Sequence, residues 1–432
     1  MKAYPKYKNS GLEFIGKIPD YWEMKKTKYL FQLIVDKAPK GNNLELLSLY
    51  TDIGVKPRKE LEQRGNRSST TDDYFIVKKK DIIVNKLLAW MGAIGVSDYD
   101  GVTSPAYDIL RQQKPLNSSF YHHLFRCGIY LTEFKKRSRG IMEMRLRLYF
   151  DELGQILVPY PPPEEQEKLV SFLDQKTTKI DRLIEIKTKQ IELLKEHRTA
   201  IINQAVTKGL NPDVKMKDSG VEWLGQIPEH WEVKPIGLVF DYISYGFTNP
   251  MPTSDEGPYM LTANDIADGK VKYETARKTE YSAYVNDLTD KSRPKKGDVL
   301  ITKDGSLGRV AVAAGKEACI NQSVAIVRVN QNYVSTDYIQ NILRSEPYQE
   351  KMIFDAGGTT IKHIYITRLA KMRVAIPDNH EQQDICGFIN LIRNRINKTI
   401  EATNTQINQL KEYRTALISE VVTGKIDVRN EV

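Results

Sequence analysis

Cysteine is scarce in this chain of 432 residues, which has only Cys127, Cys319 and Cys386. Three isolated cysteines exclude a disulfide scaffold and a cysteine-based zinc site, and they fit a reducing cytoplasm. Long hydrophobic runs are also missing, because no stretch approaches the roughly 18 apolar residues that a membrane span needs. The first residues, MKAYPKYKNSG, have no apolar core of the kind found in a secretory signal. We therefore expect a cytoplasmic protein without membrane contact.

Sequence motifs for catalysis are missing as well. A DNA adenine methyltransferase needs an Asn/Asp-Pro-Pro-aromatic motif, and the nearest runs, at 160–163 and 249–252, each lack part of it. A P-loop for ATP needs GxxxxGK followed by Ser or Thr, and none occurs. No two of the six histidines lie at i,i+4, as a metal-binding pair with an acid on one helix face would need. We expect no catalytic group, no metal and no cofactor bound by this chain.

Charge is unevenly distributed along the chain. The formal net charge is +9, and residues 1–160 hold 27 Lys or Arg against 18 Asp or Glu, so the remainder is neutral overall. A basic excess indicates a polyanionic partner such as nucleic acid, although an excess of this size is weak evidence.

The chain is a tandem duplication. Residues 10–31 align without gaps to residues 219–240 with ten identities in 22 positions, and residues 191–209 align to 407–425 with ten in 19. The offsets of 209 and 216 define a unit of about 210 residues. Between these borders lies a divergent block of roughly 130 residues, in which only fragments such as 78–86 and 294–303 still match. Either the blocks perform different versions of one task, or they have drifted without acquiring separate specificities.

Each repeat ends in a long helical pattern. A Pro run at 161–163 precedes the first, which ends near Gly209, and the second begins near Glu381. Both show a narrow apolar stripe typical of a coiled-coil seam. The seam residues are Leu173, Ile180, Ile184, Ile191, Leu194 and Ile201 in the first helix, and Ile389, Ile396, Ile400, Ile407, Leu410 and Leu417 in the second. About 40 residues make a rod of about 60 Å, which needs a partner. We expect the two helices to pack antiparallel, although each helix could instead pack on its own domain.

The variable blocks have the pattern of a mixed α/β fold. Runs typical of strands, at 81–86, 299–303, 310–314 and 323–329, alternate with helical stretches near 119–136 and 336–354. The predicted architecture is a pseudo-twofold tandem repeat, in which two mixed α/β blocks are joined by an antiparallel coiled-coil spacer.

One motif imitates a metal-dependent nuclease. Pro19-Asp20 and Glu23-Met24-Lys25 resemble a PD…ExK pattern, but the two acids are only three residues apart, and the second repeat has Glu229 in place of Asp20. We favour a packing element in which Trp22 and Trp231 act as anchors.

Basic and polar side chains in both blocks are candidates for DNA contact. Cations can neutralise phosphates, and Arg or Lys can pair with guanine edges in the major groove. The candidates are Arg58, Arg64, Arg67, Lys86, Trp90, Lys136, Arg139, Arg145 and Arg147 in the first block, and Lys303, Ser306, Lys362, His363, Tyr365 and Arg368 in the second. Each of them could equally be an ordinary surface residue.

The doubled SGxExxGxIPxxWE motif, the KKxDxxxxK strand, PPPEEQ and the xLKExRTAxI helix end resemble the specificity subunit of type I restriction-modification systems. The resemblance implies target recognition domain 1 at 1–160, spacer helix 1 at 161–210, target recognition domain 2 at 211–376 and spacer helix 2 at 377–427. It further implies that each recognition domain reads one half of an asymmetric, bipartite site in double-stranded DNA. The spacer would set the half-site separation and dock two modification subunits.

In such a system the partners carry the chemistry. Modification subunits hold S-adenosylmethionine, and restriction subunits use ATP and Mg to cleave DNA. The second repeat departs from the PPPEEQ motif after Pro377, which puts the start of its helix in doubt. Residues 219–376 hold 19 basic and 19 acidic side chains, so we expect domain 2 to depend on locally placed groups for DNA affinity. The alternative is an orphan DNA-binding or antirestriction scaffold without modification partners.

Overall fold

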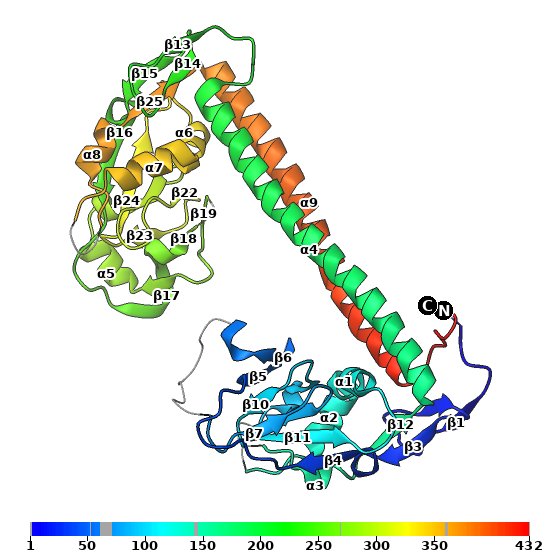
Figure 1. Ribbon diagram of the computed structural model, residues 1–432. Helices are drawn as coiled ribbons and strands as arrows, with labels where there is room; N and C mark the ends of the chain where they lie inside the picture. Colours follow the sequence, from blue (N-terminus) through cyan, green and yellow to red (C-terminus); the bar gives the residue numbers. More distant parts are fainter. Residues whose placement is uncertain are drawn as a thin grey trace. The chain divides into compact units, whose positions relative to one another are not determined.

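The tandem repeat folds into two units, each of which holds one variable block and part of both long helices. A computed structural model describes residues 2–51, 53–60, 71–141, 146–267, 269–358 and 362–431. Unit 1 comprises Met1–Thr188 and Asn404–Val432, and unit 2 comprises Lys189–Thr403. The two ends of the chain lie together in unit 1 (Figure 1), where Lys2 bridges to Asp427.

A four-stranded antiparallel sheet, in the order β4-β11-β8-β9, forms the centre of unit 1. Its strands are Phe31–Ile34 (β4), Tyr107–Gln112 (β11), Ile82–Asn85 (β8) and Ile94–Val96 (β9). All four residues of β8 are buried, as its unbroken apolar run predicts. The other antiparallel pairs are β1 (Tyr7–Asn9) with β2 (Lys17–Pro19), β3 (Glu23–Lys26) with β12 (Leu157–Tyr160), β5 (Leu47–Tyr50) with β6 (Gly54–Pro57), and β7 (Phe75–Val77) with β10 (Gly101–Thr103).

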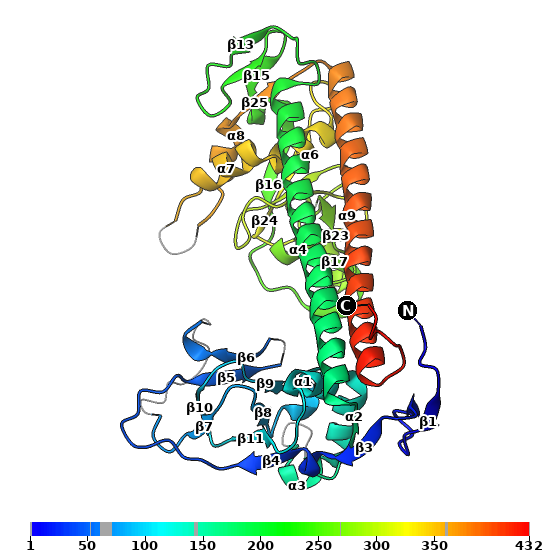
Figure 2. The ribbon, with the colours of Figure 1, turned by 45° about the vertical axis from the view of Figure 1, so that its right-hand side comes forward.

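Two helices, α1 (Ser118–Arg126) and α2 (Gly128–Arg137), pack beside this sheet (Figure 2). The sequence predicted one helical stretch at 119–136, and the structure corrects this to two helices. The break falls at Cys127, whose extended backbone (ψ 145°) leaves the helical region. The short helices of unit 1 are α3 (Phe150–Leu153), η1 (Thr27–Tyr29), η2 (Arg58–Glu60) and η3 (Ala89–Met91).

Unit 2 repeats this plan around the sheet β16-β24-β21-β22. These strands are Phe240–Tyr245 (β16), Val324–Val329 (β24), Val299–Thr302 (β21) and Val310–Val312 (β22). The flanking pairs are β13 (Met216–Asp218) with β14 (Gln226–Pro228) and β15 (Glu232–Pro235) with β25 (Arg373–Ile376). The helices α6 (Thr336–Arg344) and α7 (Glu346–Phe354) correspond to α1 and α2, and α8 (Ile366–Lys371) corresponds to α3. Here too the helical stretch predicted at 336–354 is broken, at the extended Ser345.

Unit 2 also contains a small subdomain whose order of strands and helices is not repeated in the described residues of unit 1. It is built from β17 (Thr253–Leu261), β20 (Arg277–Thr279), β23 (Ala318–Ile320), β18 (Ile266–Ala267), β19 (Lys270–Val271), α5 (Tyr281–Asn286) and η6 (Ala263–Asp265), and η5 (Ile236–Val239) and η7 (Asp290–Ser292) complete the unit. The strands β17 and β23 pair in parallel. The interior of the block has therefore diverged while its frame has not.

An ion pair between a buried aspartate and a partly exposed arginine stabilises the central sheet at the same place in both units. In unit 1, Arg111 donates two hydrogen bonds to Asp81, at 2.9 and 2.7 Å, and in unit 2 Arg328 donates two to Asp298, at 2.8 and 2.7 Å. Each Asp also caps the turn before its strand by accepting a backbone N–H, from Lys78 and Lys295 respectively. The matching fragments KKKD and KKGD therefore contain the same aspartate, which caps a turn and pairs with an arginine of the neighbouring strand. This shared ion pair places β8 and β21, the strands that follow, in equivalent positions.

The two long helices, α4 (Pro163–Lys208) and α9 (Asn379–Val422), run antiparallel. In unit 1, Asp181 contacts Arg414 at 2.9 Å and Lys187 contacts Gln406 at 2.7 Å, so the partner number falls as the residue number rises. Figures 1 and 2 both draw the helices side by side. The mixed α/β fold class with a spacer of two antiparallel helices is thereby confirmed, and none of the described helices is long and apolar enough to cross a membrane.

The seam predicted for the helix pair coincides with its inner face. All twelve residues chosen for it from the two helices are buried or partly buried: Leu173, Ile180, Ile184, Ile191, Leu194, Ile201, Ile389, Ile396, Ile400, Ile407, Leu410 and Leu417. By contrast, Leu183, Ile186 and Leu193 are about half exposed. The departure of the second repeat from the PPPEEQ motif does not change how its helix begins, because Gln382 of α9 makes the same two contacts as Gln166 of α4. The side-chain oxygen of each glutamine accepts a hydrogen bond from a backbone N–H, and its amide nitrogen donates one to a proline carbonyl.

Each long helix ends on the opening motif of a repeat. A Cβ built on Gly209, after α4, would lie 3.4 Å from the ring of Trp231, and one built on Gly424, after α9, would lie 3.0 Å from the ring of Trp22. Both glycines have positive φ, 74° and 69°, and a Cβ on Gly424 would lie 2.4 Å from Pro19 Cδ. The two tryptophans are fully buried. The motif that imitates a nuclease therefore lies in the packing around a buried tryptophan that receives a helix end.

Candidate nucleic-acid interface

The loop that follows β8 presents apolar side chains to solvent. The amide oxygen of Asn85 accepts a hydrogen bond from the backbone N–H of Leu87 at 3.1 Å, and Gly92 closes the loop with φ 96°. Ala89 is fully buried and anchors the loop, whereas 38% of Leu87 and 51% of Met91 are exposed. The loop is therefore attached to the core through the buried Ala89, while Leu87 and Met91 remain partly exposed to solvent.

A second segment of unit 1 meets this loop. Arg139 and Arg147 exchange two backbone hydrogen bonds of 2.9 Å, and we call these two paired residues the hairpin base of unit 1. The next residue, Leu148, donates its backbone N–H to the carbonyl of Lys86 at 2.9 Å. The loop 86–92 and this hairpin base thus form one surface, which we call surface 1.

The charged candidates on surface 1 differ in how fully they are paired. The ammonium of Lys86 lies 3.1 Å from Asp108, and Arg139 pairs with Glu152. Lys135 lies 4.9 Å from the ring centroid of Trp90, whose indole N–H donates to the Leu87 carbonyl at 3.1 Å. Lys136 is exposed at the end of α2. Surface 1 therefore combines exposed aliphatic groups with a positive rim.

Arg58 lies near the same end of the sheet. Arg58 begins η2, and the charge of its guanidinium lowers the pKa of Tyr107, which pairs with Asn85 across the sheet. Burial raises the pKa of Tyr107, as does neighbouring Tyr50, while Arg58 offsets part of the rise. The other three candidates of the first block, Arg64, Arg67 and Arg145, lie outside the described residues.

Unit 2 builds the equivalent surface with the same backbone contacts. The loop 303–308 follows β21, and Ile364 donates its backbone N–H to the carbonyl of Lys303 at 2.9 Å. Gly357 and His363 exchange backbone hydrogen bonds of 3.0 and 2.7 Å, as Arg139 and Arg147 do in unit 1. We call this loop and hairpin base surface 2.

The side chains of surface 2 are of a different kind. Asp304 contacts both His363 and Lys303, the latter at 3.0 Å, and Lys303 also lies 5.5 Å from the ring centroid of Tyr245. Lys303 and Asp304 keep only 18% and 20% of their side-chain surface exposed. Surface 2 is therefore a partly buried network with hydrogen-bonding ability in place of an apolar loop.

An open pocket of about 750 Å³ lies beside this network. Asp304 and Ser306 line it together with polar residues of the subdomain, among them Asn264, Asn321 and Arg277. Sequence patterns missed Asn264, Asn321 and Arg277, because they lie in other segments and carry no motif. Ser306 thus faces a polar hollow with both hydrogen-bond donors and acceptors.

The remaining candidates of the second block, Lys362, Tyr365 and Arg368, lie on both sides of His363 in the sequence. Lys362 and Tyr365 are exposed, and the guanidinium of Arg368 lies 5.2 Å from the ring centroid of Tyr365. Arg368 also donates a hydrogen bond of 2.6 Å to the Asp355 carbonyl. Among the described residues, no group of three or more His, Cys, Asp or Glu side chains is arranged to hold a metal ion.

The chain matches one protein-family model twice, and this model describes the type I restriction modification DNA specificity domain. The matches cover residues 19–196 and 228–412. In sequence the chain is 22% identical over 430 residues to the type I restriction enzyme MjaVIII specificity subunit of Methanocaldococcus jannaschii, covering 96% of this chain and 95% of that protein. It is 23% identical over 328 residues to the EcoBI specificity subunit of Escherichia coli, covering 72% and 68%.

Solved structures are similar over almost the whole chain. One, from a study of assembly and conformational transition in the type I R-M system, has a TM-score of 0.73 at 16% identity and covers 95% of this chain and 99% of that one. The HsdS subunit of Thermoanaerobacter tengcongensis has a TM-score of 0.59 at 16% identity and covers 95% and 98%. At such identities the likeness concerns the fold.

Proposed function

The chain belongs to the family of type I restriction-modification DNA specificity proteins, and we propose that each of its units reads one half of an asymmetric, bipartite site in double-stranded DNA. As a member of this family it is a specificity subunit and not a catalytic one. Its partners are DNA and the modification and restriction subunits of the same complex. Two copies of the modification subunit, holding S-adenosylmethionine, and restriction subunits using ATP and Mg complete the proposal.

One observation carries this function: the same loop and hairpin surface is built twice with different side chains. Surface 1 offers Leu87, Met91 and cations, which suit a thymine methyl group and guanine edges. Surface 2 offers Asp304, Ser306 and His363, which suit the cytosine amino group and other hydrogen-bonding edges. Because the two surfaces share their backbone contacts but differ in their side chains, they would read half-sites of different sequence.

The helix pair supports a role as a ruler. Half-sites in the major groove face the same side of the duplex only at separations set by the turn of about 10.5 base pairs. A helical spacer of constant length restricts recognition to one such separation. The same helices are the proposed docking surface for the modification subunits.

Methylome sequencing tests the proposal. The gene is deleted in its host, or expressed together with its modification subunits in a host free of methylation. Expression should produce adenine methylation at one bipartite, non-palindromic motif, which the deletion removes. If active modification subunits methylate the same motif without this chain, or if the chain assembles with none of them, the specificity role is wrong and the orphan scaffold stands.

A further inference from the structure

The second recognition block has no net charge with which to attract DNA. Residues 219–376 hold 19 basic and 19 acidic side chains. Because phosphate neutralisation supplies much of the affinity of DNA-binding proteins, a neutral block needs its cations gathered in one place. The structure contains such a place.

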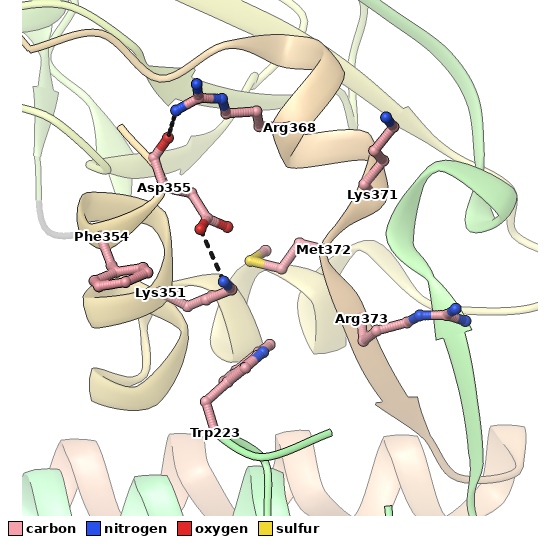
Figure 3. Close-up of a pocket in the computed structure, with 8 residues that line it drawn as sticks. All are labelled: Trp223, Lys351, Phe354, Asp355, Arg368, Lys371, Met372 and Arg373. Atoms are coloured by element: carbon pink, nitrogen blue, oxygen red, sulfur yellow. Dashed lines mark hydrogen bonds and ion pairs between the residues drawn. The ribbon is translucent and has the colours of Figure 1, made fainter. Parts of the chain in front are cut away.

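An open pocket of about 460 Å³ lies between the end of α7, α8, the start of β25 and the turn at Trp223 (Figure 3). Four cations line it, Lys351, Arg368, Lys371 and Arg373, against a single carboxylate. That carboxylate, Asp355, binds Lys351 at 2.8 Å. Formal charge in the pocket is therefore +3.

Two of the cations are available to a ligand. Lys371 and Arg373 are exposed, and neither forms an ion pair within the described part of the chain. In Figure 3 both side chains extend from the strand and helix end beside Met372, on the opposite side of the hollow from Phe354. Their charges are not needed to hold the fold, so they can neutralise an anion from outside.

Apolar side chains line the pocket beside the cations, among them Trp223 and Phe354. Trp223 packs edge-on against the buried Tyr348, with ring centroids 5.0 Å apart, and 83% of Phe354 is exposed. Cations beside apolar side chains can contact both the phosphates and the sugars of a nucleic-acid backbone. Backbone contacts of this kind position a protein on the duplex without reading sequence.

The pocket is continuous with surface 2. A Cβ built on Gly357, at the hairpin base, would lie 2.7 Å from the ring of Tyr365 and 3.2 Å from the guanidinium of Arg368. Arg368 in turn lines the pocket and binds the Asp355 carbonyl. A duplex that contacts surface 2 through a base edge therefore reaches the pocket through its backbone.

The corresponding positions of unit 1 carry less charge. In α7 a shift of 218 residues aligns Ser345 with Cys127, and after the hairpin base a shift of 216 aligns Ile364 with Leu148. The residues of unit 1 at the positions of the five charged residues of the pocket are then Glu133, Arg137, Glu152, Gln155 and Leu157. These five sum to −1, and Arg137 is paired with Glu133. The neutral block is thus the more positive one at this single place.

We propose that the pocket formed by Lys351, Arg368, Lys371 and Arg373 binds a phosphate of the DNA backbone next to the half-site read by surface 2. This inference rests on the proposed function, because it takes DNA to lie on surface 2. The pocket supplies affinity that depends on salt and is indifferent to base sequence.

The double variant Lys371→Gln/Arg373→Gln tests this, assembled with its modification subunits. Affinity for a duplex carrying the bipartite motif is measured over a series of salt concentrations. The expected result is weaker binding, with the slope of log K against log salt reduced in magnitude by about 0.9 for one lost phosphate contact. The methylated motif stays the same.

The double variant Lys217→Gln/Lys291→Gln removes two exposed charges of unit 2 outside the pocket. It should keep the wild-type slope. If the salt slope of the Lys371→Gln/Arg373→Gln variant equals that of the Lys217→Gln/Lys291→Gln variant, the proposal is overturned. It is also overturned if the Lys371→Gln/Arg373→Gln variant methylates a different motif. Weakened assembly with a modification subunit at an unaltered salt slope identifies an acidic protein segment as the occupant, and also overturns it.

A third variant, Ser306→Ala/His363→Ala, separates this inference from the proposed function. It should change the second half of the motif if surface 2 reads bases. If this variant leaves the motif intact, the proposed reading by surface 2 fails, whatever the salt slopes show. If it changes the motif while the pocket variant keeps the wild-type slope, only the phosphate pocket fails.

Discussion

Deletion of one heptad from each long helix shortens the spacer by a known amount. Residues 184–190 of α4 and 404–410 of α9 face each other, as the contact of 2.7 Å between Lys187 and Gln406 shows. Removing both segments retains the flanking pairs, Asp181 with Arg414 and Arg198 with Asn397. A whole heptad also preserves the side of each helix on which the seam lies.

The expected size of the effect follows from helix and DNA geometry. Seven residues at 1.5 Å each shorten each helix by about 10.5 Å, which equals about three base pairs. Three base pairs rotate the duplex by about 100°, whereas one heptad rotates the helix face by only about 20°. The original half-sites then match the two units neither in distance nor in phase. Methylation of the original motif should therefore be lost, and any that persists should occur at half-sites about three base pairs closer.

Methylome sequencing of cells that express the shortened chain with its modification subunits measures this, and circular dichroism and gel filtration check that the complex still forms. A control that keeps the length replaces residues 184–190 by IEATNTQ, the equivalent segment 400–406, and should keep the original spacing. Full methylation of the original motif by a correctly assembled shortened complex would refute the ruler.

Three further predictions concern single domains. Exchange of residues 1–155 for another recognition block should change one half of the methylated motif, and a change in both halves would contradict separate reading. The variant Asp298→Ala leaves the guanidinium of Arg328 without its bidentate partner, so urea unfolding should show a loss of about 2–3 kcal/mol in the stability of unit 2; a loss below about 0.5 kcal/mol would argue against stabilisation by the shared ion pair. Burial lowers the pKa of His122 to about 3, and its ring accepts the backbone N–H of Val96. In the unfolded chain the imidazole of His122 becomes protonated near pH 6.5, so the stability that neutral His122 gives the folded state is present above pH 6.5 and is lost as pH falls toward 3. Between pH 7 and 5 this loss is about 2 kcal/mol. The variant His122→Gln should lack this part of the pH dependence in thermal unfolding, and a pH profile equal to that of the wild type would contradict the prediction.

Local patterns were sufficient for the frame of this protein. The apolar runs at 81–86 and 299–303 form β8 and β21, and the narrow stripes form the inner face of α4 and α9. Each of these depends on the spacing of apolar residues within one element, which the order of residues states directly. The breaks at Cys127 and Ser345 were missed although the sequence marks both, because Gly128 directly follows Cys127 and Pro347 lies in the first turn of α7.

The candidate sites were predicted as separate residues and not as surfaces. Lys303 and His363 were both chosen from the sequence, but not Asp304, which contacts both of them across 59 residues. The phosphate pocket was missed except for Arg368, because its cations come from α7, α8 and β25 and are spaced like ordinary surface charges. No periodicity marks residues that meet only through the packing of different elements.

By itself, the sequence determined the duplication, the family resemblance, the position of the central strands and the seam of the long helices, because each is written in a repeat or in a local period. Only the tertiary structure decided which side chains share a surface. It brought Lys86 to Leu148, next to the pair Arg139 and Arg147, and it gathered four cations into a pocket of a block with no net charge. Contacts of this kind depend on how distant segments pack against one another, and the charge of a region, summed along the chain, does not contain that information.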